Sequence, residues 1–379
     1  MIVSAATAVI DGRTCRPGWV RTSGRHILEC GSGEAPGPPD VHFPDCVVVP
    51  GFIDMHVHGG GGESFTDGRS SGVAEFHLRH GTTTMLASLV TAAPDELLSA
   101  VADLAEATRS GMVAGIHLEG PWLSPARCGA HDHTLMRSPH PAEIDAVLAA
   151  ADGTIRMVTL APELAGSAEA IRRFRDADVV VAVGHTNANY EQTRGAIALG
   201  ATVGTHLFNA MPPLDHRDPG PVLALLTDPR VTVELIADGV HVDPEMVRAV
   251  LQWLGPDRVA LVTDAIAAAG YGDGAYRLGA VPIDVESGVA RVRGTPTIAG
   301  STATMDEMFR LVAELSTLAD AVQTTSATPA RALGLDRMGR LQAGYDANLV
   351  VLDRDLQVHK VMHNGIWHPS AASGTTAKP

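Results

Sequence analysis

The chain contains little of what marks several large classes of protein. Its 379 residues include four cysteines, none in a CxxC spacing, which disfavours a disulfide framework and an iron–sulfur or other thiolate site. Free thiols in a reducing compartment are the better interpretation. Aromatic residues make up 4% of the chain, although 45% of it is hydrophobic. A large core is therefore expected, and it must be built from aliphatic side chains and alanine.

Positive charge is also scarce. Lysine and arginine number 28 against 43 acidic residues, which gives a formal net charge of −15. We therefore expect neither nucleic acid nor an anionic membrane as the main partner. The N-terminus has no basic region followed by a long apolar run, and no stretch of about 18 apolar residues occurs. We expect a soluble, cytoplasmic protein without a membrane segment.

The most informative stretch runs from Val49 to Gly59, where an apolar segment ends in two histidines one residue apart. Alternate residues of a strand point to the same face, so His56 and His58 project side by side. Glycines at 59–62 leave space above them for a ligand. Such a pair alone is as often an ordinary surface feature as a metal site, so its meaning depends on the other strands.

Apolar runs alternate with helical patterns through the middle of the chain, as in a parallel sheet covered on both faces. The expected strands are Val47–His56, Thr83–Leu89, Val113–Leu118, Arg156–Leu160, Val179–Gly184, Thr202–His206, Val231–Ile236 and Val259–Thr263. The expected helices are Pro94–Arg109, Ala142–Ala150, Ala168–Ala177, Asn189–Leu199, Pro244–Leu254 and Ala303–Ala319. This pattern predicts an α/β fold with a (β/α)8 TIM-like barrel over residues 50–343. A doubly wound open sheet is the alternative, but no glycine-rich dinucleotide loop follows an early strand.

Both ends of the chain are predicted to form short strands separated by Gly, Pro and Asp turns. Residues 1–49 are too few for a core of their own, and residues 344–379 supply further strands. We therefore predict one small β-sandwich domain built from both termini, with a frayed polar tail over residues 370–379.

Functional groups of a barrel lie at the C-terminal ends of its strands. Here six of the eight expected strands end in residues suited to metal binding or proton transfer, namely His56 with His58, Glu119, His185, His206, Asp238 with His241, and Asp264. A single buried histidine or aspartate is more often structural, but a cluster of them is unfavourable without a cation. The pattern favours a divalent ion such as zinc, iron, cobalt or manganese, which would lower the pKa of a bound water.

These motifs resemble the amidohydrolase superfamily and, within it, the N-acetylglucosamine-6-phosphate deacetylase family. The resemblance covers residues 45–350 and rests on the segments Pro50–Asp54, Leu118–Trp122, Gly184–Ala188, Thr205–Met211, Ala237–His241 and Val262–Ala265. Many members of the superfamily use a carbamylated lysine as a bridging ligand, and no lysine lies at these strand ends. The resemblance implies a metal-dependent hydrolase on a (β/α)8 barrel.

The metal site is the most specific implication. The resemblance implies one ion held by Glu119, His185 and His206, with zinc as the first choice. Family members differ at the first motif, and the intact pair His56 and His58 implies capacity for a second ion per subunit. Glu119 and Asp264 would then be shared ligands.

The resemblance also implies a reaction. The N-acetyl group of N-acetyl-D-glucosamine 6-phosphate is removed by metal-activated water, which gives D-glucosamine 6-phosphate and acetate. Asp264 is the implied general base and then general acid, and His131 polarises the acetyl carbonyl. The implied substrate contacts are Ala130, His131, Asn209, Ala210, Arg217, His241, Ile298, Ala299 and Gly300. Arg217 matches an arginine that often reaches the neighbouring active site, so a homodimer is implied.

The sequence leaves two other interpretations open. Another amidohydrolase reaction, such as cyclic-amide hydrolysis or deamination, is the nearest, although Asn209, Ala210 and His241 argue against it as phosphate-binding elements. A barrel without catalysis, acting as a scaffold, is a different class. It predicts the loss of metal ligands, whereas every expected ligand is present.

Overall fold

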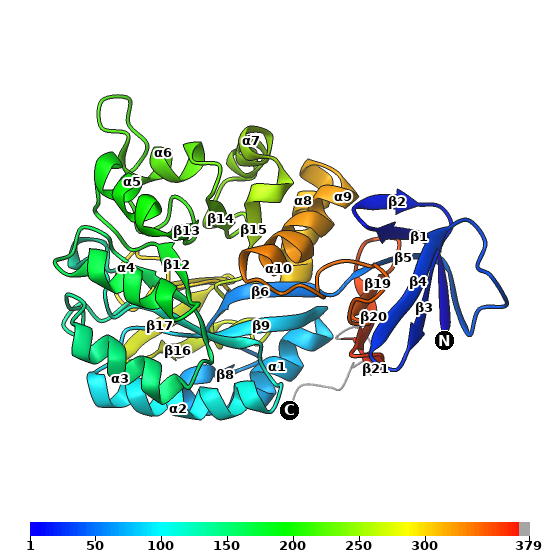
Figure 1. Ribbon diagram of the computed structural model, residues 1–379, viewed down its shortest axis with the longest axis horizontal. Helices are drawn as coiled ribbons and strands as arrows, with labels where there is room; N and C mark the ends of the chain where they lie inside the picture. Colours follow the sequence, from blue (N-terminus) through cyan, green and yellow to red (C-terminus); the bar gives the residue numbers. More distant parts are fainter. Residues whose placement is uncertain (371–379) are drawn as a thin grey trace.

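The computed structural model describes residues 1–370, so most of the predicted frayed tail, residues 371–379, lies outside the described residues. The chain forms a barrel with surrounding helices and a separate sheet, which lies on the right in Figure 1. The N-terminus belongs to this separate sheet (Figure 1).

The barrel is built from eight strands that pair in parallel, in the order β15-β14-β13-β12-β11-β10-β9-β6. The strands are β6 (Phe52–Val57), β9 (Thr82–Leu89), β10 (Gly115–Glu119), β11 (Ile155–Leu160), β12 (Val180–Val183), β13 (Ala201–Gly204), β14 (Thr232–Leu235) and β15 (Val259–Leu261). Each neighbours the next along the chain, which confirms the barrel rather than the doubly wound sheet.

Single hydrogen bonds, rather than a ladder, close the barrel between β6 and the chain that follows β15. The backbone N–H of Asp264 donates to the carbonyl oxygen of His56 at 2.8 Å. The carboxylate of Asp54 accepts from the hydroxyl of Thr263 at 2.5 Å and from its backbone N–H at 3.2 Å. Burial raises the pKa of Asp54 to about 7 despite these bonds. Asp54 therefore fixes the position of Asp264 relative to the first strand.

Helices cover the outside of the barrel. They are α1 (Ser70–Arg79), α2 (Pro94–Arg109), α3 (Pro141–Ala151), α4 (Ser167–Asp176), α5 (Tyr190–Leu199), α6 (Gly220–Thr227), α7 (Pro244–Leu254) and α8 (Met305–Leu315). In α5, Asn189 and Gln192 form a reciprocal capping box that fixes the first turn. The sequence pattern missed α1, which buries only Val73 and His77, and α6, which is short and apolar throughout.

Two predicted elements are each broken in the structure. The expected strand Val47–His56 was wrong as one element: β5 (Val41–Pro50) belongs to the terminal sheet, and β6 begins the barrel. The chain turns at Gly51, where a Cβ would lie 2.1 Å from Oγ1 of Thr83. The expected helix Ala303–Ala319 ends at Leu315, and Thr317 caps a new helix, α9 (Leu318–Val322). A π-helical turn (Gln323–Ala327) and α10 (Thr328–Ala332) follow.

Both chain ends form one separate sheet domain, as predicted. Its strands pair in one continuous sheet, and the two-layer arrangement of a β-sandwich stays a prediction. Its strands are β1 (Ile2–Ile10), β2 (Arg13–Cys15), β3 (Gly18–Ser23), β4 (His26–Ser32), β5, β19 (Leu349–Leu352), β20 (Val358–His363) and β21 (Ile366–Pro369). The antiparallel pair of β5 and β19 joins the N-terminal strands to the C-terminal ones. The sheet has its own apolar cluster, which includes Val3, Val20 and Leu349. The domain limits at 49/50 and 343/344 stay a prediction.

A three-stranded antiparallel sheet was not predicted. It consists of β16 (Gly274–Leu278), β17 (Val281–Glu286) and β18 (Val289–Val292), between β15 and α8. Single bridges join Arg291 to Ile298 and Ala265 to Ser301. This sheet therefore brings the segment 298–301 beside the end of β15. Two short strands, β7 (Gly59–Gly60) and β8 (Glu63–Ser64), pair with each other directly after His58.

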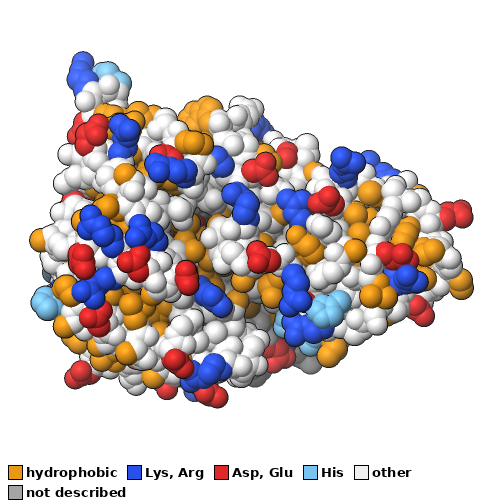
Figure 2. Space-filling model, in the orientation of Figure 1, with side chains coloured by type: hydrophobic (Ala, Val, Ile, Leu, Met, Phe, Trp, Pro, Cys, Tyr) orange, Lys and Arg blue, Asp and Glu red, His pale blue; other side chains and the backbone are white. Residues whose placement is uncertain are grey.

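The surface in this view carries acidic and basic side chains interspersed with apolar ones (Figure 2). Among residues 1–370, no helix has the length and hydropathy needed to cross a membrane.

Candidate metal and substrate site

Four histidines and two carboxylates converge at the C-terminal ends of the barrel strands. His56 lies on β6 and His58 follows it, Glu119 ends β10, His185 follows β12, His206 follows β13, and Asp264 follows β15. These residues lie far apart in the sequence and meet here because the carboxyl ends of parallel strands share one edge. All six are buried or nearly so.

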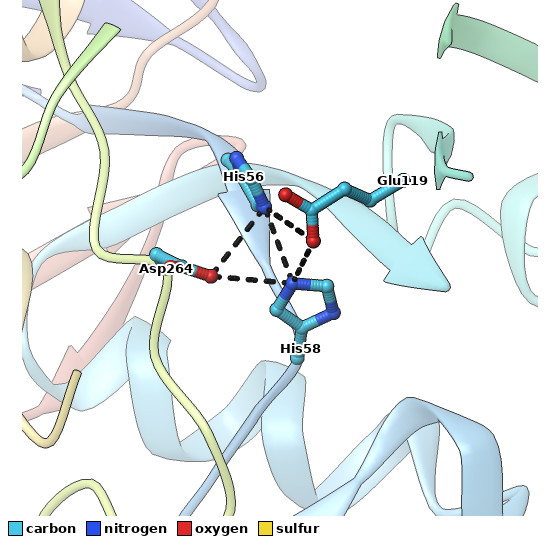
Figure 3. Close-up of side chains that lie close together, drawn as sticks. All are labelled: His56, His58, Glu119 and Asp264. Carbon is cyan, nitrogen blue, oxygen red and sulfur yellow. Dashed lines mark hydrogen bonds and ion pairs between the residues drawn. The ribbon is translucent and has the colours of Figure 1, made fainter. Parts of the chain in front are cut away.

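One group of ligand atoms consists of Oε2 of Glu119, Oδ1 of Asp264 and the Nε2 atoms of His56 and His58, which point toward one another (Figure 3). Nε2 of His58 lies 3.1 Å from this oxygen, 3.2 Å from Nε2 of His56 and 3.2 Å from Oδ1 of Asp264. Nε2 of His56 lies 3.4 Å from each carboxylate oxygen. We call His56, His58, Glu119 and Asp264 the first ligand group.

A second ligand group uses the other oxygen of the same carboxylate. Oε1 of Glu119 lies 3.0 Å from Nε2 of His206 and 3.1 Å from Nε2 of His185, and the two nitrogens are 3.1 Å apart. Glu119 thus presents one oxygen to each group, as a carboxylate that bridges two cations does. The cluster could hold a metal ion, and the two oxygens of Glu119 face different histidine pairs.

The spacing of these atoms fits a shared ion. Ligands about 2.1 Å from one ion lie about 3.4 Å apart in a tetrahedron and about 3.0 Å apart in an octahedron. The distances of each histidine nitrogen from its neighbouring ligand atoms in both groups, 3.0–3.4 Å, fall in this range. Nδ1 of His58 meets the carbonyl oxygen of Ser88, and Nδ1 of His185 meets that of Arg127. These Nδ1 atoms carry protons, so each Nε2 offers a lone pair to the cluster.

The charges in the cluster also call for a cation. Burial alone would lower the pKa of His58, but Asp264 and Glu119 raise it to about 9. Burial alone would raise the pKa of Glu119, but His56, His131 and His185 hold it well below its usual range. Protons on the rings would satisfy these carboxylates, and a divalent ion displaces such protons when it binds. The residues therefore fit a metal site.

His131 belongs to the cluster in a different way. Its Nε2 lies 3.2 Å from Oε2 of Glu119, but its Nδ1 accepts from the backbone N–H of Thr91 at 3.2 Å. A neutral ring that accepts at Nδ1 carries its proton on Nε2, which faces the cavity. Burial, which outweighs the attraction of Glu119, lowers the pKa of His131 to about 4. The contact with Thr91 thus favours a neutral ring with its proton on Nε2, and this nitrogen also lies within 4.8 Å of ligand atoms of Glu119 and His185.

The backbone at the site is strained. His185, His206 and Asp264 have φ values of 44°, 27° and 46°, in the left-handed region that side chains other than glycine rarely adopt. Such conformations cost about 1–3 kcal/mol each and persist where the surroundings fix them. The turn after each strand directs the side chain back over the barrel opening.

A cavity of about 460 Å³ opens over the cluster. Of the predicted contacts, Ala130, His131, Asn209, Ala210, His241, Ile298 and Gly300 line it. Ala299 does not, because it is fully buried in the apolar cluster against the three-stranded sheet. Gly300 must be a glycine: its φ is 61°, and a Cβ would lie 2.7 Å from the carbonyl oxygen of Asp264.

His241 is held by a carboxylate from its own loop. Nδ1 of His241 donates to Oδ2 of Asp238 at 2.7 Å, and Oδ1 of Asp238 accepts from the backbone N–H of Val240 and of His241. Burial alone would lower the pKa of His241, but Asp238 raises it. The ring therefore presents Nε2 to the cavity and favours an anionic or polar group there.

Arg217 lies away from the cavity of its own chain. It is exposed in the loop between β13 and α6, which protrudes at the top of the view in Figure 1. The tip of this protrusion shows a basic and a histidine side chain in Figure 2, with acidic side chains directly below them. Among the described residues, the arginine that lines the cavity is Arg127, whose Nε donates to Oδ1 of Asn187 at 3.0 Å. No sequence motif pointed to Arg127.

Glu234 on β14 and Thr91 after β9 also contact the site, and neither was expected from the sequence. Oε2 of Glu234 lies 3.1 Å from Nδ1 of His56. The sequence does offer a signal for Glu234, because it is a charged residue within the apolar run Val231–Ile236. A buried strand tolerates such a residue only when a partner is present. Nothing in the sequence around Thr91 points to its contact with His131.

The profile of the amidohydrolase family matches residues 47–367. The chain belongs to this family. N-acetylgalactosamine-6-phosphate deacetylase of Escherichia coli O157:H7 is 38% identical over 84% of this chain and 87% of the relative. N-acetylglucosamine-6-phosphate deacetylase of Homo sapiens is 38% identical over 86% of each chain.

Solved structures of this amidohydrolase's relatives agree with it closely. N-acetyl-D-glucosamine-6-phosphate deacetylase of Mycobacterium smegmatis is 51% identical, with a TM-score of 0.95 over 97% of this chain and 99% of that one. An aspartate-to-alanine variant of that enzyme, in complex with N-acetyl-D-glucosamine-6-phosphate, is 52% identical and has the same TM-score over 97% and 98% of the two chains.

Proposed function

We propose that this amidohydrolase is an N-acetylglucosamine-6-phosphate deacetylase, which releases D-glucosamine 6-phosphate and acetate. The observation that carries the proposal is the position of Glu119 between two histidine pairs, with Asp264 and His131 both lining the cavity over them. The relatives with this activity, which cover nearly the whole chain, support the substrate.

Glu119, His185 and His206 would hold one divalent ion, and His56, His58, Glu119 and Asp264 a second. A bound divalent ion supplies a water of lowered pKa and polarises the amide carbonyl. Zinc fits the nitrogen and oxygen ligands best, with iron, cobalt and manganese as alternatives.

The remaining chemistry falls to side chains. Asp264 reaches into the cavity beside Nε2 of His58, so it can accept a proton from the attacking water and return it to the departing amine. Burial opposes ionisation of Asp264, but His56 and His58 hold its pKa below the usual range, which keeps it a base at neutral pH. His131 donates from Nε2 to the acetyl oxygen as negative charge develops on it.

The sugar phosphate would extend from the cluster toward Asn209, Ala210, His241, Ile298 and Gly300. Because Arg217 lies on a protruding loop outside its own cavity, we propose that it reaches the phosphate in the neighbouring subunit of a homodimer. A cytoplasmic location is also proposed, and the four free thiols support a reducing compartment.

Arg217→Ala is expected to raise KM for the phosphorylated sugar about 10- to 100-fold with little change in kcat, because a hydrogen bond to a charged group contributes about 1.5–3 kcal/mol. Steady-state kinetics on N-acetylglucosamine with and without the 6-phosphate measure this. Arg230→Ala is the matched control, since Arg230 is also exposed and pairs with Asp228. Equal losses on both sugars would remove Arg217 from the phosphate site.

The test of the function is amine release on protein of known metal content. We expect strong preference for N-acetylglucosamine 6-phosphate over the unphosphorylated sugar, loss of activity after chelation, and recovery with a divalent ion. N-acetylgalactosamine 6-phosphate belongs in the panel, because relatives named for either sugar are 38% identical. No activity on any of the three with metal loaded would refute the substrate class and return the choice to other cyclic or linear amides.

A further inference from the structure

A buried carboxylate outside both ligand groups lies directly behind His56. Glu234, on β14, is fully buried, and its Oε2 is 3.1 Å from Nδ1 of His56. The same oxygen accepts from the backbone N–H of His206 at 3.1 Å. One oxygen of Glu234 therefore contacts a member of the first ligand group and a member of the second.

The position of this carboxylate is unfavourable unless its charge is used. Glu234 lies between Val233 and Leu235 in an apolar strand, and its Oε1 has no hydrogen-bond partner among the residues that the structure describes. A buried carboxylate in such surroundings needs a positive charge nearby. Within the described chain its ionic partner is the ring of His56.

His56 differs in this respect from the other histidines of the cluster. His58 and His185 each direct Nδ1 to a neutral backbone carbonyl, and Nδ1 of His206 has no partner in the described chain. A carboxylate behind a ligand histidine fixes the ring orientation and makes its other nitrogen a stronger ligand. The first ligand group alone therefore has this support.

The charge of the cluster also favours a second ion. Glu119, Asp264 and Glu234 are three buried carboxylates in contact with ring nitrogens. Metal ligation requires neutral rings. An ion in front of His56 would displace protons from His56 and His58 and supply, in their place, the positive charge that these carboxylates need.

We propose that Glu234 is a positioning residue that orients and polarises His56, and that it thereby determines whether the first ligand group holds its ion. The inference rests on the two-ion site proposed above, but not on the identity of the substrate. It requires no contact between Glu234 and the substrate, because Nδ1 and Nε2 lie on opposite sides of the His56 ring.

The test is a metal titration of the full chain without substrate. Protein stripped by chelation is titrated with Co²⁺, followed by visible absorption, and the ions retained after dialysis are counted by atomic spectroscopy. We expect two ions in the unaltered chain. Glu234→Gln, which keeps the oxygen but loses the charge, should lower the affinity of the first ligand group (His56, His58, Glu119 and Asp264) for its ion about 10-fold. Glu234→Ala should lower it about 100-fold. The affinity for the other ion, at Glu119, His185 and His206, should change little.

Asp306→Asn is the matched control. Oδ1 of Asp306 lies 3.1 Å from Nδ1 of His80, the same separation as between Glu234 and His56, and its other partners are Thr304 and Arg310. This variant should lose thermal stability and keep both ions at their original affinity. If the two main variants fail to fold, Glu234→Asp, whose carboxylate is withdrawn by one methylene, should also lower the affinity of the first ligand group for its ion.

Three results would overturn the proposal. The Glu234 variants could bind both ions with the original affinity, or they could bind both ions equally more weakly. The unaltered chain could also bind a single ion. Equal weakening would make Glu234 a structural residue of the whole site. Absence of deacetylase activity in a chain that still binds two ions would refute the proposed function and leave this inference standing.

Discussion

Replacing Asp264 by asparagine is expected to lower kcat for N-acetylglucosamine 6-phosphate about 10²- to 10⁴-fold, the range that general acid–base groups contribute. Asparagine keeps the shape of the side chain but cannot take a proton from water or return it to the amine. The ion at Glu119, His185 and His206 should remain, because Asp264 is closest to His58 and His56 instead. Steady-state kinetics with metal analysis of the same preparation measure both effects.

The split between kcat and KM distinguishes this role from substrate binding. Loss of proton transfer should lower kcat with KM within a few-fold of its original value. An Asp264→Asn variant that kept near-original kcat with metal bound would contradict the role of Asp264. A rise in KM alone would make it a binding residue.

Glu119→Gln is expected to abolish the binding of both ions and to lower kcat about 10³-fold or more. A neutral amide cannot bridge two cations, and bound ions contribute several kcal/mol to the reaction, at about 1.4 kcal/mol for each tenfold in rate. The ions retained after dialysis should fall toward none per chain. Excess divalent ion should restore little activity, because the ligand shared by both groups is missing.

Glu163→Gln is the matched control for this change. The carboxylate of Glu163 accepts from the hydroxyl of Thr186 and the backbone N–H of Asn187, both at 2.6 Å, so it supports the loop of His185 without facing the cluster. We expect that variant to keep both ions. Retention of one ion by the Glu119 variant at its original affinity would mean that the carboxylate serves one ligand group only.

The sequence was sufficient for the barrel and for which residues meet. Apolar runs alternating with helical patterns require a parallel sheet, and parallel strands bring their carboxyl ends to one edge. His58, Glu119 and Asp264 could therefore be grouped although they lie far apart in the chain. Local signals placed most helices within a few residues, such as α7, which begins and ends as expected.

The supporting contacts could not be predicted in this way. Glu234 and His56 are 178 residues apart, and His131 contacts Thr91 across 40 residues. Neither contact follows from strand order, because each depends on which side-chain atom faces which neighbour after packing. The three-stranded sheet beside Ile298–Gly300 was missed because its short strands have too few apolar residues for a clear period.

Residue types at the strand ends were enough to indicate the kind of chemistry, because imidazoles and carboxylates gathered there have few uses other than binding a cation. The role of each side chain, in contrast, came from the packing of the strands against one another. Because of this packing, each histidine pair faces a different oxygen of Glu119. The packing also favours a proton on the nitrogen of His131 that faces the cavity, and Arg217 does not line that cavity. These outcomes depend on distances of 3.0–3.4 Å between atoms of different strands, and periodicity along one chain does not specify such distances.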